Sequence, residues 1–264
     1  DLAKIDNTTI TEGGEVIQEG GEVTGVLIDN AMDLVYNVMP KLSREQSIQA
    51  LKDAQDYCFD YGLTTVNDAG LDRNTILLID SLQKAGTLEM RMYAMISNTA
   101  ADVDYFIENG ILKTEKLNVR SVKVYGDGAL GSRGAALRAP YSDRHNHYGA
   151  MVTPVDSIYS LAKKLAKTDF QMNTHAIGDS ANTVILNVYA EALKDESDFQ
   201  SFAATKARSL GLTTDELIVL MNSAYIYLPF ITYSKHSRLL LIPRMIDRFK
   251  YKVEGGIIWW NIKV

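Results

Sequence analysis

The chain has 264 residues, of which 46% are hydrophobic and 23% charged, and its formal net charge is −6 at pH 7. This composition is typical of a globular protein with one large domain or two smaller ones, and it excludes a fibrous repeat. The acidic balance and the scattered basic residues argue against nucleic-acid binding, and no stretch has the roughly 18–20 uninterrupted apolar residues of a membrane span.

The single cysteine and the polar start of the chain bear on its cellular compartment. Cys58 has no partner for an intramolecular disulfide and belongs to no Cys-x-x-Cys motif, so the sequence favours a cytoplasmic protein. The first residues are acidic and polar, unlike a signal peptide, and the chain has no initiator methionine. We therefore expect a fragment or a processed form.

Residues 1–40 are expected to form a β-rich N-terminal segment. A Gly-Gly-Glu-Val unit occurs at residues 13–16 and again at 20–23, with short β-branched runs around it. Glycine pairs between such runs are typical of turns that join neighbouring strands. The pattern predicts a hairpin before the main fold.

Residues 41–195 alternate between strand and helix patterns. A Ser-x-x-Gln capping box at 43–46 begins a helix that ends at Gly62. Strands are then predicted at 63–66, 87–97, 117–127 and 170–179, and the helices that follow them at 72–86, 99–110, 154–169 and 179–195. This order specifies an α/β fold with parallel strands, either an open doubly wound sheet or a TIM-type barrel. No Gly-x-Gly-x-x-Gly motif follows the first strand, which disfavours a dinucleotide-binding sheet.

Residues 196–264 lose this alternation. The pattern predicts helix over 197–229, and the aromatic and β-branched residues with a Gly-Gly pair over 238–264 predict a β-rich part. We place a domain boundary near Asp195 and leave the class of this segment open.

Polar residues occur at the carboxyl ends of the predicted strands, where the functional groups of parallel sheets usually lie. Asp68, Asp127 and His175 each lie at the predicted carboxyl end of a strand, the edge at which βα loops converge. His175 is suited to zinc binding or proton transfer, although a lone histidine is more often a hydrogen-bonded structural group. These positions are the first candidates for a site.

Lys123 lies between Val122 and Val124, so its side chain is expected on the opposite face of the strand. One interpretation is a lysine whose amine reaches solvent at the strand end. The other is a desolvated lysine with a lowered pKa, able to react with a carbonyl group or with carbon dioxide. A Schiff-base lysine is a third hypothesis for the same residue.

The loop after Lys123 is rich in glycine and could bind an oxygen through its backbone N–H groups. Arg133 could bind a substrate carboxylate, or it could form a surface pair with an aspartate in an ordinary tight turn. His145 and His147 have the spacing of a metal pair on a strand, but their polar surroundings favour a loop.

Three motifs in this order resemble the amidohydrolase family 3 group of metal-dependent hydrolases, the branch that includes N-substituted formamide deformylase-like proteins. They are "GLTTVNDAG", "VKVYGDGALGSRGAALRAPYSD" and "NTHAIGDSAN", and "GVLIDNAMDLV" at 25–35 is also similar. The resemblance covers about residues 20–195. It implies a distorted TIM barrel and hydrolysis of an amide, formamide or related C–N bond in a small-molecule substrate.

The resemblance also implies a site that holds Zn²⁺ or another divalent metal. Lys123 then corresponds to a carbamylated lysine and His175 to a metal-binding histidine, while Asp68, Asp127, Ser132 and Arg133 are expected to contact the substrate. The family's His-x-His pair and its later histidine and aspartate have no counterpart in this chain, and residues 196–264 do not resemble the family. The expectation is therefore a truncated, rearranged or chimeric chain.

Two functions stay open on these grounds. One is a metal-dependent hydrolase represented by an incomplete catalytic domain, and the other is a non-catalytic remnant or binding module that keeps the half-barrel. Four βα units cannot close an eight-stranded barrel. We therefore expect the open sheet edge to be covered by residues 196–264, by a partner, or by a second copy of the chain.

Overall fold

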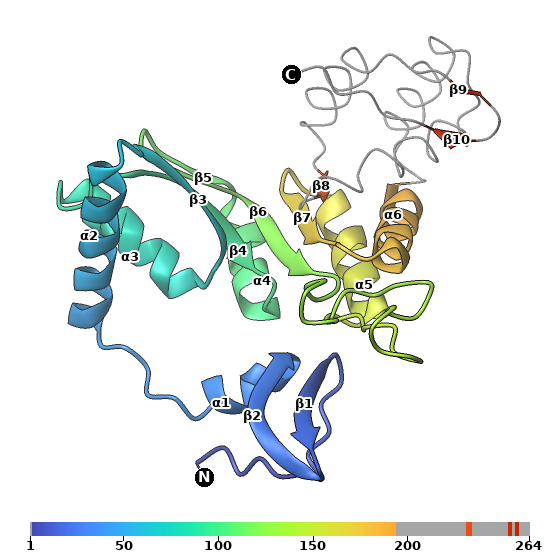
Figure 1. Cartoon of the computed structure of the whole chain (residues 1–264). Helices are drawn as coiled ribbons and strands as arrows, with labels where there is room; N and C mark the ends of the chain where they lie inside the picture. The colour runs from blue at the N-terminus through green and yellow to red at the C-terminus, as the bar shows by residue number, and fades with distance from the viewer. Residues whose placement is uncertain (1, 194–230, 234–252, 255–256, 259–264) are drawn as a thin grey trace.

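The computed structural model describes residues 2–193, 231–233, 253–254 and 257–258 (Figure 1). The helices are η1 (Asn30–Met32), α1 (Asp33–Tyr36), α2 (Arg44–Asp60), α3 (Arg73–Lys84), α4 (Ala100–Asn109), α5 (Val155–Ala166) and α6 (Asp179–Leu193). The strands are β1 (Gly14–Glu19), β2 (Glu22–Asp29), β3 (Thr65–Leu71), β4 (Arg91–Ser97), β5 (Leu112–Lys113), β6 (Leu117–Tyr125), β7 (Gln171–His175), β8 (Ile231–Tyr233), β9 (Val253–Glu254) and β10 (Ile257–Ile258). The helix predicted over 197–229 lies outside the described residues.

The central sheet has the strand order β3-β4-β6-β7-β8, and β5 pairs with β6. Strands β3, β4, β6 and β7 are parallel, and a helix follows each of them along the chain. The predicted strand–helix alternation is therefore confirmed as a mixed α/β fold with a parallel-rich sheet. The described strands do not close into a barrel, so the TIM-type barrel is not established.

Strand β8 covers one edge of this sheet. It belongs to the segment 196–264 and pairs antiparallel with β7, with Ile231 opposite Thr174. The later segment therefore supplies part of the edge cover that the open sheet was predicted to need. At the other end of the strand order lies β3, whose second edge is paired with no strand of the described residues. Strands β9 and β10 also pair with each other, within the part predicted to be β-rich.

Several predicted strand boundaries were wrong. The strand predicted at 170–179 ends at His175, because the backbone N–H groups of Ile177 and Gly178 donate to Asp127, and the strand predicted at 117–127 ends at Tyr125. The strand expected to begin at residue 87 begins at Arg91, because the backbone N–H groups of Glu89 and Met90 donate to Gln55 Oε1 of α2 instead of to a neighbouring strand. Strand β3 continues to Leu71, so Asp68 lies within the strand and not after it. The capping box of α2 is confirmed by the reciprocal hydrogen bonds of Ser43 and Gln46.

One hydrophobic cluster joins the four helices α3 to α6 to a single face of the sheet. Its largest buried members on the helices are Ile76, Ile79, Phe106, Ile158, Leu165 and Ile185. Val122 and Val124 of β6 belong to the same cluster. Since successive side chains of a strand point to opposite faces, Ser121 and Lys123 lie on the other, polar face. The core thus orients Lys123 away from the helices.

The predicted N-terminal hairpin is present and packs against the loop between β6 and α5, residues 126–154, which we call the glycine loop (Figure 1). Arg144 of this loop forms a two-pronged ion pair with Glu15 of β1, with one N···O distance of 2.7 Å. The Asn30 side chain donates to the carbonyl of Val152 at 2.9 Å. These contacts fix the end of β2 beside the glycine loop.

In the part of the chain that the structure describes, no helix is both long and apolar enough to cross a bilayer.

Candidate functional site

Lys123 is buried, with only 2% of its surface exposed. Its ammonium group donates to the Val124 carbonyl at 3.1 Å and lies 3.3 Å from the centre of the Tyr125 ring. By register its neighbours in the sheet are Ser97 on β4 and Asn173 on β7. Burial lowers the pKa of Lys123 from its ordinary 10.5 to about 8, because the charged form loses hydration. The desolvated interpretation of this lysine is the one that the geometry supports.

Strand β3 approaches the same lysine through a glycine. Gly70 has a φ of +125°, a conformation that residues with a side chain rarely adopt. A β-carbon at Gly70 would lie 3.8 Å from Lys123 Cγ and from Ser97 Oγ. Three neighbouring strands therefore meet around the stem of Lys123.

His175 ends β7 and lies opposite Tyr125 of β6 in the strand register. The two rings are 5.9 Å apart, and the Tyr125 ring is also the ring that contacts Lys123. The histidine side chain keeps 20% of its surface exposed, and its Nε2 is 3.8 Å from Asp127 Oδ1. The structure thus brings Lys123, His175 and Asp127 to one edge of the sheet, around Tyr125.

Asp127 is buried, and its carboxylate accepts three backbone N–H groups. Oδ2 accepts from Ala136 at 2.9 Å and from Gly178 at 2.8 Å, and Oδ1 accepts from Ile177 at 2.9 Å. These bonds tie the glycine loop to the turn between β7 and α6. Asp127 was predicted to contact substrate, and the structure places it as the link between these two loops.

Ser132 and Arg133 make contacts within the glycine loop. Ser132 donates to the Ala129 carbonyl at 3.1 Å. Arg133 binds Asp143 through two nitrogens on the exposed side of the loop, with the shortest contact at 2.8 Å. This is the surface Arg–Asp pair that the sequence left open as an alternative. His147 contacts the Arg133 carbonyl at 2.8 Å, as expected for a loop residue.

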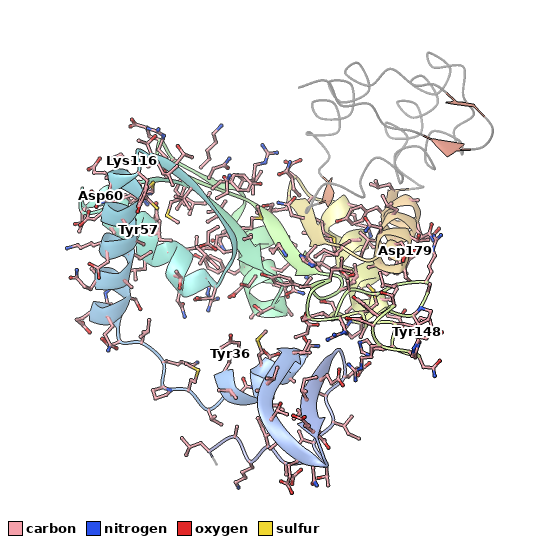
Figure 2. All side chains as sticks on the ribbon, viewed as in Figure 1. Tyr36, Tyr57, Asp60, Lys116, Tyr148 and Asp179 are labelled. Carbon is pink, nitrogen blue, oxygen red and sulfur yellow. The ribbon has the colours of Figure 1, made fainter. Side chains whose placement is uncertain are left out.

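The remaining part of the loop packs on α6 (Figure 2). Asp179, at the first turn of this helix, accepts the backbone N–H of Arg138 at 2.9 Å. Tyr148, labelled in the same region of the view, accepts the N–H of Leu137 through its carbonyl at 2.8 Å. The glycine loop is therefore tied to α6 as well as to the turn after β7.

Asp68 is not brought to the face that carries Lys123. It lies beside Ala94 of β4, whose side chain is buried against the helices, and register neighbours share a face of the sheet. Burial raises the pKa of this carboxyl group. The predicted substrate contact through Asp68 is therefore separated from Lys123 by the sheet itself.

Asp29, at the end of β2, is a neighbour of the site that sequence reasoning missed. A β-carbon at Gly128 would lie 2.0 Å from Asp29 Oδ2, and one at Gly134 would lie 2.1 Å from the same oxygen. Burial raises the pKa of Asp29, Asp127 raises it further, and His175 lowers it. The stretch at 25–35 was noted only for its family likeness, and no local motif marks Asp29.

The described residues offer an incomplete donor set for a metal ion. Lys123 and His175 supply two nitrogens, while the oxygens of Asp127 are engaged by backbone N–H groups. Within the described ranges no group of three or more His, Cys, Asp or Glu side chains could hold a metal. Structural and catalytic zinc sites use three or four protein ligands. The described part of the chain therefore does not by itself fit a metal ion.

The fold is similar to that of solved metal-dependent hydrolases. A hydrolase of this class from Pyrococcus horikoshii superposes with a TM-score of 0.57 at 23% identity, over 72% of this chain and 38% of its own. One from Pyrococcus furiosus also gives 0.57, at 24% identity, over 72% of this chain and 39% of its own. At this level of identity the likeness establishes the fold.

The family follows from the sequence comparison. The model of the amidohydrolase family matches residues 1–218, and this chain belongs to that family, as its three motifs predicted. The match is longer than the predicted 20–195, so the expectation that residues 196–264 do not resemble the family is wrong for residues 196–218. The protein LONG AFTER FAR-RED 3 of Arabidopsis thaliana is 30% identical over 199 residues, which are 70% of this chain and 34% of that protein. The amidohydrolase YtcJ of Bacillus subtilis is 29% identical over 187 residues, 69% of this chain and 35% of its own length. The chain thus spans about a third of these relatives.

Proposed function

We propose that this chain is part of a metal-dependent hydrolase that cleaves amide-type, non-peptide C–N bonds, and that its sheet belongs to a TIM-type barrel. The observation that carries the proposal is the meeting of Lys123 and His175 around Tyr125 at the carboxyl edge of the parallel strands. Active sites of β/α barrels form at that edge. Membership of the amidohydrolase family supports the reaction class.

Lys123 is suited to modification by carbon dioxide. With its pKa near 8, a substantial fraction of the side chain is a neutral amine at neutral to mildly alkaline pH. The amine nitrogen attacks the carbon of carbon dioxide, an N–C bond forms, and one N–H proton leaves to solvent. The product is an anionic carbamate with two oxygens. This converts a buried amine into an oxygen donor of the kind that divalent metals bind.

Zn²⁺ or another divalent metal is the cofactor that the proposal requires, with the Lys123 carbamate and His175 as its ligands from this chain. A bound divalent metal would lower the pKa of water and polarise a carbonyl group. Since the described residues contain no third ligand, no step is assigned to the metal here. The net reaction consumes water and an amide, breaks the C–N bond, and gives a carboxylate and an amine.

A second candidate function is a binding module that keeps the half-barrel and binds amides without turnover. The incomplete donor set favours it, because a site with two ligands holds metal weakly. Hydrolysis and binding differ in their products. A binding module would retain the intact amide in its complex, whereas a hydrolase releases a carboxylate.

The experiment is an assay of the full chain against N-acyl amines and N-substituted formamides, with Zn²⁺, Mn²⁺ or no added metal. The proposal predicts release of formate or another carboxylate that requires metal and stops with a chelator. Absence of carboxylate release from metal-loaded protein that binds the amides would favour the binding module instead.

A further inference from the structure

Asp127 lies at the start of the glycine loop and Asp29 lies beside this loop, and the surroundings of the two carboxylates differ. Asp127 has 1% of its surface exposed, and its oxygens accept the backbone N–H groups of Ala136, Ile177 and Gly178. A carboxylate has about four lone-pair positions, and three of these are occupied in a closed, buried setting. Asp127 therefore holds the two loops together and is shielded from a ligand.

Asp29 is half-buried, and among the described residues no hydrogen bond to its carboxylate is formed. Its oxygen Oδ2 occupies the space where β-carbons of Gly128 and Gly134 would otherwise lie. Glycine at both positions is what lets the carboxylate enter the loop. The hairpin thus places the Asp29 carboxylate, which can still accept hydrogen bonds, between two glycines.

The backbone at Asp29 is held in a conformation that is uncommon for a residue with a side chain. Its φ is 50° and its ψ is −125°. Such a conformation stores strain, and it persists only where the surroundings enforce it. The neighbouring Asn30 enforces it here, since its side chain donates to Val152 and to the Glu12 carbonyl. The anchored hairpin end therefore aims Asp29 at the loop.

The contact with Gly128, which directly follows Asp127, places Asp29 beside the candidate site. Asp127 and His175 are the ionisable groups that act on its carboxyl, the first unfavourably for its charge and the second favourably. A cationic or N–H-bearing group in this place would relieve the repulsion between the two carboxylates. The carboxylates of Asp29 and Asp127 thus favour a hydrogen-bond donor that carries or acquires positive charge.

We infer that Asp29 is a substrate-binding residue, supplied by the β1–β2 hairpin, whose carboxylate accepts the N–H of an amide substrate or of the amine product. The substrate class rests on the proposed function. The hairpin is then part of the site, and the two carboxylates have different roles. Asp127 links the glycine loop to the turn after β7, and Asp29 binds the ligand nitrogen.

The test is calorimetric titration of the full chain with butylammonium, with N-butylformamide, and with N-butyl-N-methylformamide, which has no N–H. Asp29→Asn keeps the size of the side chain and removes its charge, and we expect it to weaken binding of the first two probes about tenfold or more. Binding of the third probe should change little. Asp33→Asn, at an exposed position of α1, is the matched control.

A second pair of variants tests the position of Asp29 without removing it. Gly134→Ala would place a β-carbon 2.1 Å from Asp29 Oδ2 and should weaken the same two probes, whereas Gly131→Ala, with nothing within 4 Å, should not. In Asp29→Asn protein the effect of Gly134→Ala should largely disappear, because both changes act on one carboxylate. Thermal unfolding of each variant reports loss of fold separately.

The outcomes separate this inference from the proposed function. Weakened binding in Asp29→Asn and Gly134→Ala, with both controls unchanged, supports the inference whether or not the chain hydrolyses formamides. Equal binding by Asp29→Asn and wild type, or no binding of either N–H probe by wild type, overturns it. Hydrolysis by the wild type in that case would leave the proposed function standing.

Discussion

Lys123 links burial to pH-dependent stability. Its pKa falls from 10.5 in the unfolded chain to about 8 in the fold, so between these values the unfolded chain binds more protons than the folded one. The free energy of unfolding should therefore rise from pH 8 to pH 10.5. Lys123→Met should remove this rise, and Lys41→Met, at an exposed position, should keep it. Urea unfolding in carbon-dioxide-free buffer measures both, and an unchanged pH profile in Lys123→Met would show that burial does not perturb the lysine.

We expect Asp127 to stabilise the fold by linking two loops, and to have no direct part in the chemistry. Asp127→Asn removes a charge and leaves at least one of the three backbone N–H groups without its acceptor. We predict a loss of about 2–4 kcal/mol in the free energy of unfolding. Asp143→Asn removes only an exposed pair with Arg133 and should have a small effect. Equal denaturant midpoints for the two variants would contradict the linking role.

The sequence placed Lys123 within a predicted strand and His175 at the end of the next one, and the family resemblance singled them out as site residues. Their closeness could be expected because the carboxyl ends of parallel strands converge. It could not separate Asp127 from Asp29. Two of the backbone N–H groups that occupy Asp127 belong to Ile177 and Gly178, about 50 positions later, and Asp29 approaches a loop about 100 positions later. For Arg133 the sequence left two partners open, a substrate carboxylate and a surface aspartate. Both bind the same guanidinium group, so the residue type alone could not decide between them.

At the scale of elements, the glycine loop and the turn after β7 approach too closely for side chains. A β-carbon at Gly178 would lie 1.9 Å from the Ala136 carbonyl oxygen, a backbone atom that cannot move aside freely. Gly178→Ala should therefore lower the free energy of unfolding by about 2 kcal/mol or more. Gly131→Ala, in open space, should change it by no more than about 0.5 kcal/mol. Chemical denaturation compares them, and a neutral Gly178→Ala would mean that the two loops are not in contact.

The elements themselves were largely predictable, and the errors have a common cause. Helix α2 was found from its capping box, whose hydrogen bonds are local. The start of β4 was missed because Gln55, more than thirty residues earlier, takes the backbone N–H groups of Glu89 and Met90. Local signals fix where a helix begins, whereas the extent of a strand depends on which neighbour accepts its hydrogen bonds.

At the scale of the whole molecule, the alternation of strands and helices predicted the parallel sheet but not its closure. Closure requires strands beyond the four βα units, and the strand that follows β7 in the sheet, β8, lies after residue 218, where the match to the family model ends. The chain also spans about a third of its curated relatives. The hairpin, by contrast, contacts the glycine loop through Glu15 and Asn30, and no local sequence pattern predicts these long-range contacts. Through them the hairpin brings Asp29 to the site.

The central claim is that the edge carrying Lys123 and His175 is the site of a hydrolase. The most direct measurement is kcat/KM for metal-supported hydrolysis of N-butylformamide by the wild type, by Lys123→Arg and by His175→Asn, with Lys41→Arg as the control. We predict a loss of about 100-fold or more for each site variant and none for the control. Lys123→Arg and His175→Asn proteins that fold like the wild type and hydrolyse the formamide at its rate would contradict the claim.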